Sequence, residues 1–513
     1  MPPLKQWFTN LLPLDADLRR SILFFGGLGL LVAAGFTVLI SIWHLLALVM
    51  TVGFFALTLR RPRWVLGFLA VWIPLEPFLL KFVPDELYLY ARYFSEGLIY
   101  LLALTLVLRI AFGEKKIKQT PIDLPFVLFL LVLVASVVVN FVSPTVAVLG
   151  IRQILRFLIL FFAVVYLYPP TEFIRKLTGV MLLVVCLQSL IGIAQAVVGA
   201  PLDDFLIPSE RKFYESIQLT SGVTQFWDPG SRVFATLGRY DQLGTFLAFF
   251  MLLVVGMLYE RTMRETYPWM WLVLALGAPA LLLTFSRSSW FGFLLGILVI
   301  GIAFVRDRRV MIGLGAFAFM LFGYLAYSGI VVPALTEETG RQTVAERFFE
   351  SFSYERWRGE YFGLGRLFWI VQTPRVVIAA SPLFGVGPGQ FGGGAAAALG
   401  NSRAYDALGL PFGVYGTEGY IDNNWFSLWG ETGTLGLIFY LWMFVGLFLV
   451  ARRLYMRSTQ PFTRGLALGF IGATVAVALN AFLATFLEVR TLALYFWMFG
   501  AFLVVLGRRE KII

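Results

Sequence analysis

The chain has 513 residues, of which 59% are hydrophobic and 14% are charged, and its mean hydropathy is +0.81. Charged residues make up about 25% of an ordinary soluble domain, so this composition excludes a soluble globular protein. The single histidine and single cysteine exclude an intramolecular disulfide and make a zinc site improbable. Recurring apolar runs of at least about 17 residues indicate an all-α protein that crosses a membrane many times.

Fourteen apolar segments are predicted to span the membrane, and they make residues 1–513 one integral membrane domain. The predicted spans are 21–39, 41–59, 64–81, 96–112, 123–142, 152–168, 176–199, 236–259, 268–285, 289–305, 310–332, 426–450, 464–487 and 491–507. Basic residues cluster at every second connection, beginning with Arg19 and Arg20 before the first span. Because cytoplasmic connections carry the excess of Lys and Arg, both termini are expected in the cytoplasm. The net charge of +11 follows this pattern and gives no reason to expect nucleic-acid binding.

Two connections on the opposite, external side are long, namely residues 201–235 and residues 333–421. The second contains amphipathic or aromatic stretches at Arg347–Phe362 and Arg366–Ala380. Helices of this kind could lie flat in the membrane interface, or they could form a lid over a cavity that binds a lipid-linked ligand. The sequence leaves both alternatives open.

An external site meets neither ATP nor nucleotide sugars, and the chain has no G-x-x-x-x-G-K-[ST] phosphate-binding loop. A reaction there must use a substrate that arrives already activated, typically on a lipid carrier. The external cations are mostly arginines, whose planar guanidinium suits bidentate binding of phosphate or carboxylate.

Four external stretches occur in a characteristic order. They are DPGSRVFATLGRYDQLGTFLAFF (Asp228–Phe250), LLLTFSRSSWFGFLLGI (Leu281–Ile297), SPLFGVGPGQFGGG (Ser381–Gly394) and EGYIDNNWFSLWGETGTLGL (Glu418–Leu437). No single stretch is specific, but over about residues 228–513 their order and placement resemble the O-antigen ligase and polymerase superfamily. That superfamily includes bacterial protein O-oligosaccharyltransferases.

The resemblance implies a GT-C-like membrane glycosyltransferase in the bacterial inner membrane, with its active site facing the periplasm and no metal or other cofactor. Such enzymes transfer a glycan from undecaprenyl diphosphate to an acceptor hydroxyl. The acceptor of a polymerase is the sugar end of another lipid-linked repeat unit, whereas a ligase uses lipid A–core. Membrane lipid and a chain-length regulator would be further partners of a polymerase.

The resemblance also implies catalytic roles for three residues. Arg232 and Arg287 match arginines that would clamp the diphosphate and stabilise the leaving group. Alternatively, Arg287 could serve only as an anchor, with its side chain extending to the phosphates of the lipid headgroups. Asp422 stands where ligases usually carry histidine, which favours a polymerase, and it is expected to cap its helix and accept the acceptor's proton. Further substrate-binding residues are expected at Arg239, Asn423, Glu418, Gly387, Gly389 and Arg490.

Two other classes of function remain as alternatives. A lipid-linked glycan transporter or flippase would place polar groups near the middle of the membrane, and single groups such as Gln188, Gln195 and Asn480 give this alternative weak support. A non-catalytic scaffold would leave the external arginines and the Asp-Asn pair without a role.

Overall fold

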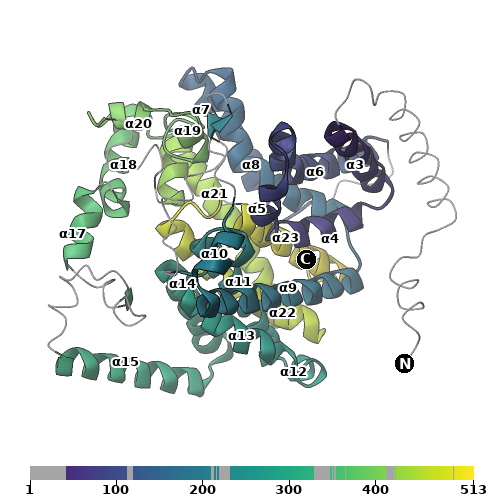
Figure 1. The fold of residues 1–513 in the computed structure, drawn as a ribbon, viewed down its shortest axis with the longest axis vertical. Coiled ribbons are helices and arrows are strands. Elements are labelled where there is room, and N and C mark those ends of the chain that lie inside the picture. The colour runs from purple at the N-terminus through teal and green to yellow at the C-terminus, as the bar shows by residue number, and fades with distance from the viewer. Residues whose placement is uncertain are drawn as a thin grey trace.

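The structure is a computed structural model in which helices dominate (Figure 1). It describes residues 42–112, 119–208, 213–214, 217–218, 232–328, 347–348, 351, 354–363, 365–411, 421, 423–488 and 490–513. In chain order the helices are α3 (Ile42–Arg60), α4 (Pro62–Trp72), α5 (Glu76–Leu79), η1 (Leu80–Phe82), α6 (Asp85–Ala111), α7 (Asp123–Val139), α8 (Pro144–Leu167), α9 (Thr171–Val198), α10 (Ala200–Leu206), η3 (Ala235–Leu237), α11 (Tyr240–Tyr259), α12 (Arg261–Thr266), α13 (Met270–Leu283), α14 (Arg287–Leu298), η4 (Val299–Val305), α15 (Arg308–Ser328), α17 (Tyr354–Phe362), α18 (Arg366–Ala380), α19 (Gly394–Ala398), α20 (Arg403–Asp406), α21 (Asn424–Arg457), α22 (Pro461–Leu483) and α23 (Arg490–Arg509).

The helical class predicted from the sequence is confirmed. Within the described residues, the only strands are β1 (Phe213–Tyr214) and β2 (Ile217–Gln218), which form a short antiparallel pair. Eight described helices are long and apolar enough to cross a membrane: α6, α8, α9, α11, α14 with η4, α21, α22 and α23. These helices make the chain a multi-span membrane protein. The number fourteen stays a prediction, because the expected span 21–39 lies outside the described residues. In addition, the helices found in the expected spans 123–142 and 268–285, α7 and α13, have only 17 and 14 residues.

The expected span 64–81 is not one straight helix. It consists of α4 and the pair α5–η1, which meet at a bend of 78°. Pro74 lies in the break and cannot donate a backbone hydrogen bond, and a proline also disfavours helical geometry in the residue before it. The carbonyl oxygen of Pro74 accepts a hydrogen bond from Thr236 Oγ1 at 2.7 Å instead. The bend is therefore tied to the chain just before α11.

Helices α11, α22 and α23 form the centre of the bundle, and most of their residues are buried. Small residues allow α11 and α22 to approach closely, since a Cβ atom on Gly256 would lie 2.1 Å from the backbone nitrogen of Gly469. Close contact through small residues is the usual way in which helices associate inside a membrane, where burial from water supplies no driving force.

The two ends of the bundle are distinguished by the contacts between helix ends. At one end, Arg464 at the start of α22 pairs with Glu260 after α11 at 3.2 Å. At the other end, the Val233 N–H donates to the Leu283 carbonyl oxygen at 3.2 Å, next to the start of α14. This grouping agrees with the connections expected from the basic residues, and the orientation in the membrane stays a prediction.

Both amphipathic stretches of the long second connection contain helix. Helix α17 (Tyr354–Phe362) covers the end of the first stretch, and α18 has the predicted bounds Arg366–Ala380 of the second. In Figure 1, α15 and α17 lie at the periphery, and α18 lies beside the shorter helices α19 and α20.

Candidate functional site

The start of α21 carries the polar stretch that the sequence singled out, but Asp422 and Glu418 lie outside the described residues. The helix begins at Asn424, and the side-chain oxygen of Asn423 accepts the Phe426 N–H at 3.1 Å. Asn423 is therefore the N-cap, and the expectation that Asp422 fills this position is wrong. The N-cap is the residue directly before the first helical residue. Because the helix begins at Asn424, this position belongs to Asn423, one residue after Asp422.

Asn423 is fully buried, and its side-chain nitrogen has no hydrogen-bond partner among the described residues. A buried donor without a partner costs about 1–3 kcal/mol. A hydrogen-bond acceptor supplied by a ligand or by a nearby segment of the protein would remove this cost.

The glycine-rich turn at residues 381–394 inserts into a break of α21. Gly433 has a φ of 69° and interrupts the helix, which releases hydrogen-bonding groups on both sides of it. The carbonyl oxygens of Gly430 and Glu431 accept the N–H groups of Val386 and Gly387 at 2.8 and 3.1 Å. In turn, the N–H groups of residues 434 and 435 donate to the carbonyl oxygens of residues 382 and 383. The turn thus replaces the helical hydrogen bonds that the break removes.

Gly387 and Gly389, expected from the sequence to bind substrate, have φ angles of 111° and 74° in the turn. Side chains are strongly disfavoured in this region of backbone conformation. The turn also packs closely on α8, because a Cβ on Gly150 would lie 2.4 Å from the backbone nitrogen of Gly389.

Glu488 joins these elements on the inner side of the turn. One carboxylate oxygen accepts the Gly394 N–H at 2.6 Å and the Gln153 amide at 3.3 Å. The other oxygen accepts from Asn424 at 3.4 Å and from the Ser427 hydroxyl at 3.5 Å. Burial raises the pKa of this carboxyl group, and the donors together with Arg156 oppose the shift. Glu488 lies between α22 and α23, so it connects four segments at one point.

A buried ion-pair network continues from Glu488 into the bundle. The Arg156 guanidinium donates to the backbone oxygen of Glu488 and lies 3.4 Å from the Glu96 carboxylate. Arg152 lies 3.0 Å from the other oxygen of Glu96, which also accepts the Tyr100 hydroxyl at 2.8 Å. The sequence analysis missed this network. The available signal was the pair of arginines one helical turn apart within an apolar run, since ionised groups within membrane helices are rare and often functional.

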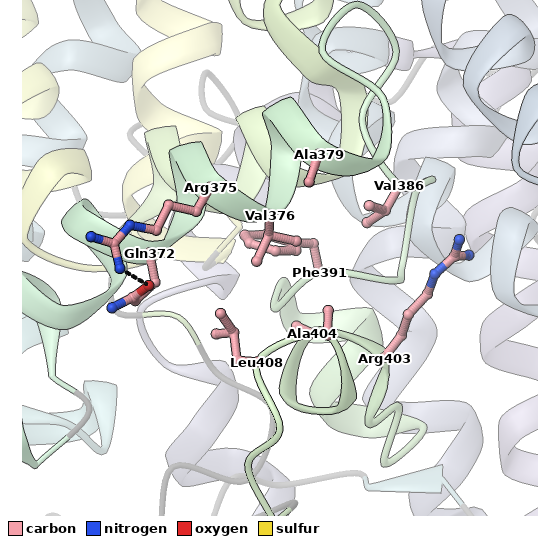
Figure 2. A pocket seen from close by; sticks show the side chains of 10 residues that line it. Gln372, Arg375, Val376, Ala379, Val386, Phe391, Arg403, Ala404 and Leu408 are labelled. Carbon is pink, nitrogen blue, oxygen red and sulfur yellow. Dashed lines mark hydrogen bonds between the residues drawn. The ribbon is translucent and has the colours of Figure 1, made fainter.

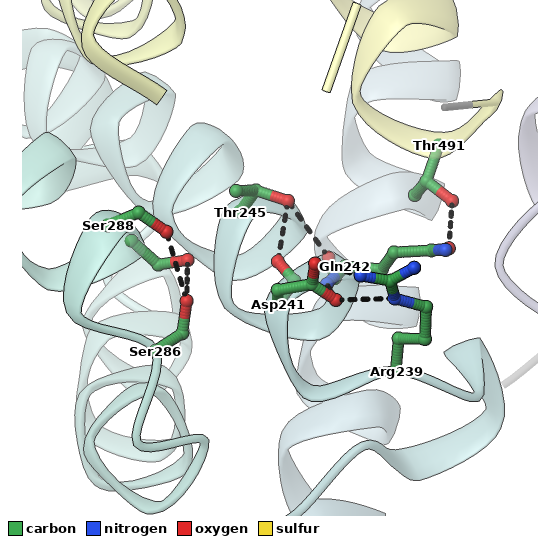
Figure 3. Close-up of polar contacts among 8 residues, drawn as sticks. Arg239, Asp241, Gln242, Thr245, Ser286, Ser288 and Thr491 are labelled. Atoms are coloured by element: carbon green, nitrogen blue, oxygen red, sulfur yellow. Dashed lines mark hydrogen bonds and ion pairs between the residues drawn. The ribbon is translucent and has the colours of Figure 1, made fainter. Parts of the chain in front are cut away.

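The predicted arginines Arg232, Arg239 and Arg287 lie around the starts of α11 and α14, and Figure 3 shows Arg239 with its partner Asp241. Arg287 is the first residue of α14, and the Arg232 guanidinium stacks 4.3 Å from the centre of the Tyr240 ring. Arg239 forms a bidentate pair with Asp241, at 3.1 and 2.8 Å. Its fork is occupied by a carboxylate in this structure, so a substrate would have to share or displace that partner.

Close contacts bring four helix starts to the same end of the bundle. A Cβ on Gly244 of α11 would lie 2.6 Å from Ser289 Oγ of α14. The Thr491 hydroxyl of α23 donates to Gln242 of α11 at 3.3 Å, as Figure 3 shows. The Leu487 N–H, just before α23, donates to Asn424 Oδ1 at the start of α21 at 2.6 Å. Arg490 is the first residue of α23, and its side chain is outside the described part of the structure.

Gln188 and Gln195, which could have lined a transport path, hold the chain before α11 instead. Gln195 Oε1 accepts the N–H groups of Phe234 and Ala235 at 3.0 and 2.9 Å, and Gln188 bonds to Thr236. These glutamines therefore fix the segment that carries Arg232.

A cavity of about 430 Å³ lies on the other side of the glycine-rich turn (Figure 2). It is bounded by α18, α20 and the turn, and its middle is apolar. Phe391 forms part of this apolar wall and packs directly on α21, since a Cβ on Gly430 would lie 1.7 Å from the Phe391 ring. Within the described residues, no group of three or more His, Cys, Asp or Glu side chains could hold a metal ion.

The fold and the site define a multi-span helical membrane protein with a polar, arginine-containing site at one end of its bundle. Residues 272–441 match the family model described as O-antigen ligase. This segment runs from α13 into α21 and includes Arg287, the glycine-rich turn and Asn423. The resemblance to the O-antigen ligase and polymerase superfamily is thereby confirmed over this segment, and members of this family are glycosyltransferase-like enzymes. No curated protein sequence matches the chain.

Proposed function

We propose that this protein is a polysaccharide polymerase of the bacterial inner membrane. It transfers a glycan from undecaprenyl diphosphate to a sugar hydroxyl of another lipid-linked repeat unit at the periplasmic face. The observation that carries this proposal is the convergence of four helix starts, those of α11, α14, α21 and α23, at one end of the bundle. Arg232, Arg287 and Asn423 all lie at these starts.

The diphosphate is bound near the starts of α11 and α14, where Arg232 and Arg287 lie. Guanidinium groups form paired hydrogen bonds with phosphate oxygens, and the positive ends of helix dipoles add favourable potential for an anion. Arg232 and Arg287 stabilise the negative charge that builds on the leaving diphosphate. In this arrangement Arg239, already paired with Asp241, positions the start of α11.

Asp422 accepts the proton of the acceptor hydroxyl. The residues on either side of it in the chain are held in place, because the Ile421 N–H donates to the Gly392 oxygen at 3.0 Å and Asn423 caps α21. The acceptor oxygen then bonds to the anomeric carbon, and the bond from that carbon to the diphosphate oxygen breaks. The bonding electron pair leaves with the diphosphate, and the proton stays on the Asp422 carboxylate.

A ligase is the second candidate, and the description of the matching family favours it. The acceptor would then be lipid A–core or a protein hydroxyl. The preference for a polymerase depends on Asp422, because ligases usually carry histidine at that position.

The test is transfer in proteoliposomes that contain a radiolabelled, diphosphate-linked oligosaccharide. The wild-type protein should elongate the glycan, and Arg287→Ala and Asp422→Ala should each lower the rate at least about 100-fold. Arg264→Ala is the control, since Arg264 is exposed on α12 at the opposite end. Equal rates in wild type and both variants would refute the site. Transfer only to lipid A–core would identify a ligase, and lipid movement between leaflets without transfer would identify a flippase.

A further inference from the structure

The cavity beside the glycine-rich turn has a cationic group at each end (Figure 2). Arg375 donates to the Gln372 side-chain oxygen at 3.3 Å, and Arg403 donates to the Gln390 side-chain oxygen at 2.8 Å. Neither guanidinium forms an ion pair with a carboxylate among the residues that the structure describes. An amide oxygen uses only part of the five-donor guanidinium and leaves its charge uncompensated. Both ends of the cavity are therefore suited to an anion.

Between the arginines the cavity is lined by apolar side chains, among them Val376, Phe391 and Leu408. Its volume of about 430 Å³ lies within the range of small-molecule sites. An apolar wall of this kind suits the apolar face of a sugar ring or an acyl substituent. A ligand that matches the whole cavity combines such a face with a negative charge.

The cavity lies next to the proposed site of proton transfer. Phe391, on the cavity wall, packs against Gly430 of α21. The next residue along the turn, Gly392, accepts the hydrogen bond from Ile421, which directly precedes Asp422. The diphosphate-binding arginines lie at other helix starts. The wall of the cavity is therefore connected to the chain one residue before Asp422, which makes this cavity the candidate for the acceptor sugar.

We propose that this cavity binds the acceptor glycan through an anionic sugar, which carries a carboxylate or a phosphate substituent. The inference rests on the proposed function, because that function supplies the acceptor. It narrows the acceptor to a lipid-linked repeat unit that contains an acidic sugar.

Binding of soluble sugars tests this inference without requiring turnover. The full-length protein in zwitterionic nanodiscs is titrated calorimetrically with glucuronate, glucose 6-phosphate and glucose. Either or both anionic sugars should bind more tightly than glucose, and Arg375→Gln should weaken that binding about 10-fold, as expected for one charge-assisted hydrogen bond. Arg403→Gln should do the same. Arg403→Gln removes the contact with Gln390 and could disturb the turn. Arg375 is exposed, so Arg375→Gln is expected to fold normally and keeps the test decisive.

Arg358→Gln is the matched control, because Arg358 is an exposed arginine on α17 that does not line the cavity. Its binding constants should equal those of the wild type. The inference is overturned if no anionic sugar binds, if glucose binds equally well, or if Arg375→Gln binds as the wild type does. Equal competition by a short-chain phosphatidylglycerol would assign the cavity to a lipid headgroup and also overturn it. The binding titration contains no donor lipid and does not depend on turnover. A failure of glycan transfer in the proteoliposome assay would therefore count against the proposed function and not against this inference.

Discussion

At the scale of single residues, Asn423 supplies the cap of α21 and also carries a buried amide nitrogen without a hydrogen-bond partner among the described residues. Asn423→Ala removes the cap and should cost about 1 kcal/mol of stability, whereas Asn423→Asp keeps an oxygen for the Phe426 N–H and should keep most of it. Thermal unfolding in detergent measures both changes. If aspartate destabilises the protein as much as alanine does, capping is not the role of this side chain in stability.

Glu488 makes the stability dependent on pH, since burial raises its pKa above the ordinary value. The folded state then favours the protonated carboxyl group more than the unfolded state does. This contribution is complete below the unfolded pKa of about 4.3 and is lost as the pH rises through the higher folded pKa. Glu488→Gln has no carboxyl group to titrate.

The thermal midpoint of the wild type should therefore fall relative to that of Glu488→Gln as the pH is raised from about 4.3. Parallel midpoints across the titration would show that this carboxyl group has the same pKa in both states. Ser427→Ala is a useful comparison, because it removes one hydrogen bond to Glu488 and leaves the titrating group in place.

At the scale of secondary-structure elements, the break in α21 depends on Gly433. An alanine there would have a φ of 69°, and its Cβ would lie 2.4 Å from Gly385 N and Leu383 O. The strained backbone alone costs about 1–3 kcal/mol, and the clash would expel the inserted turn. We expect Gly433→Ala to lower the unfolding temperature and abolish transfer.

The control for this substitution is Gly179→Ala, in the interior of α9, where an added Cβ meets nothing within 4 Å. This change should be neutral or stabilise the helix by up to about 1 kcal/mol. If Gly433→Ala behaves like Gly179→Ala, the break in α21 does not require glycine.

The same elements show how far the sequence could predict the site. Local signals located α18 at its observed bounds, the glycine-dependent turn and the arginines at the helix starts. The insertion of the turn into α21 could not be predicted, because its hydrogen bonds join residues 44 to 52 positions apart, such as Val386 with Gly430 at 2.8 Å. The network of Glu96, Arg156 and Glu488 joins residues still farther apart. Hydropathy and spacing describe one segment at a time and carry no information about such pairings.

At the scale of the whole molecule, the charge pattern predicts that the basic connections and the arginine site lie on opposite sides of the membrane. The contacts between helix ends agree with this separation, and the side that each end faces is a prediction. Arg464 and Glu260 pair at one end, and the helix starts that carry Arg232 and Arg287 meet at the other. If basic connections face the cytoplasm, the glycine-rich turn and the cavity face the periplasm. The site would then meet lipid-linked glycans and be separated from nucleotide sugars, which agrees with the proposed substrate.

Cysteine labelling in intact cells measures this orientation directly. The single natural cysteine, Cys186, is buried in α9 and can be replaced by alanine to give an unreactive background. Arg375→Cys, at an exposed position of α18, should react with a membrane-impermeant maleimide in spheroplasts. Arg264→Cys, on exposed α12, should react only after the membrane is permeabilised. Both positions are exposed, so a difference in labelling reports the side of the membrane. The reverse pattern would place the arginine site in the cytoplasm and exclude a periplasmic transferase.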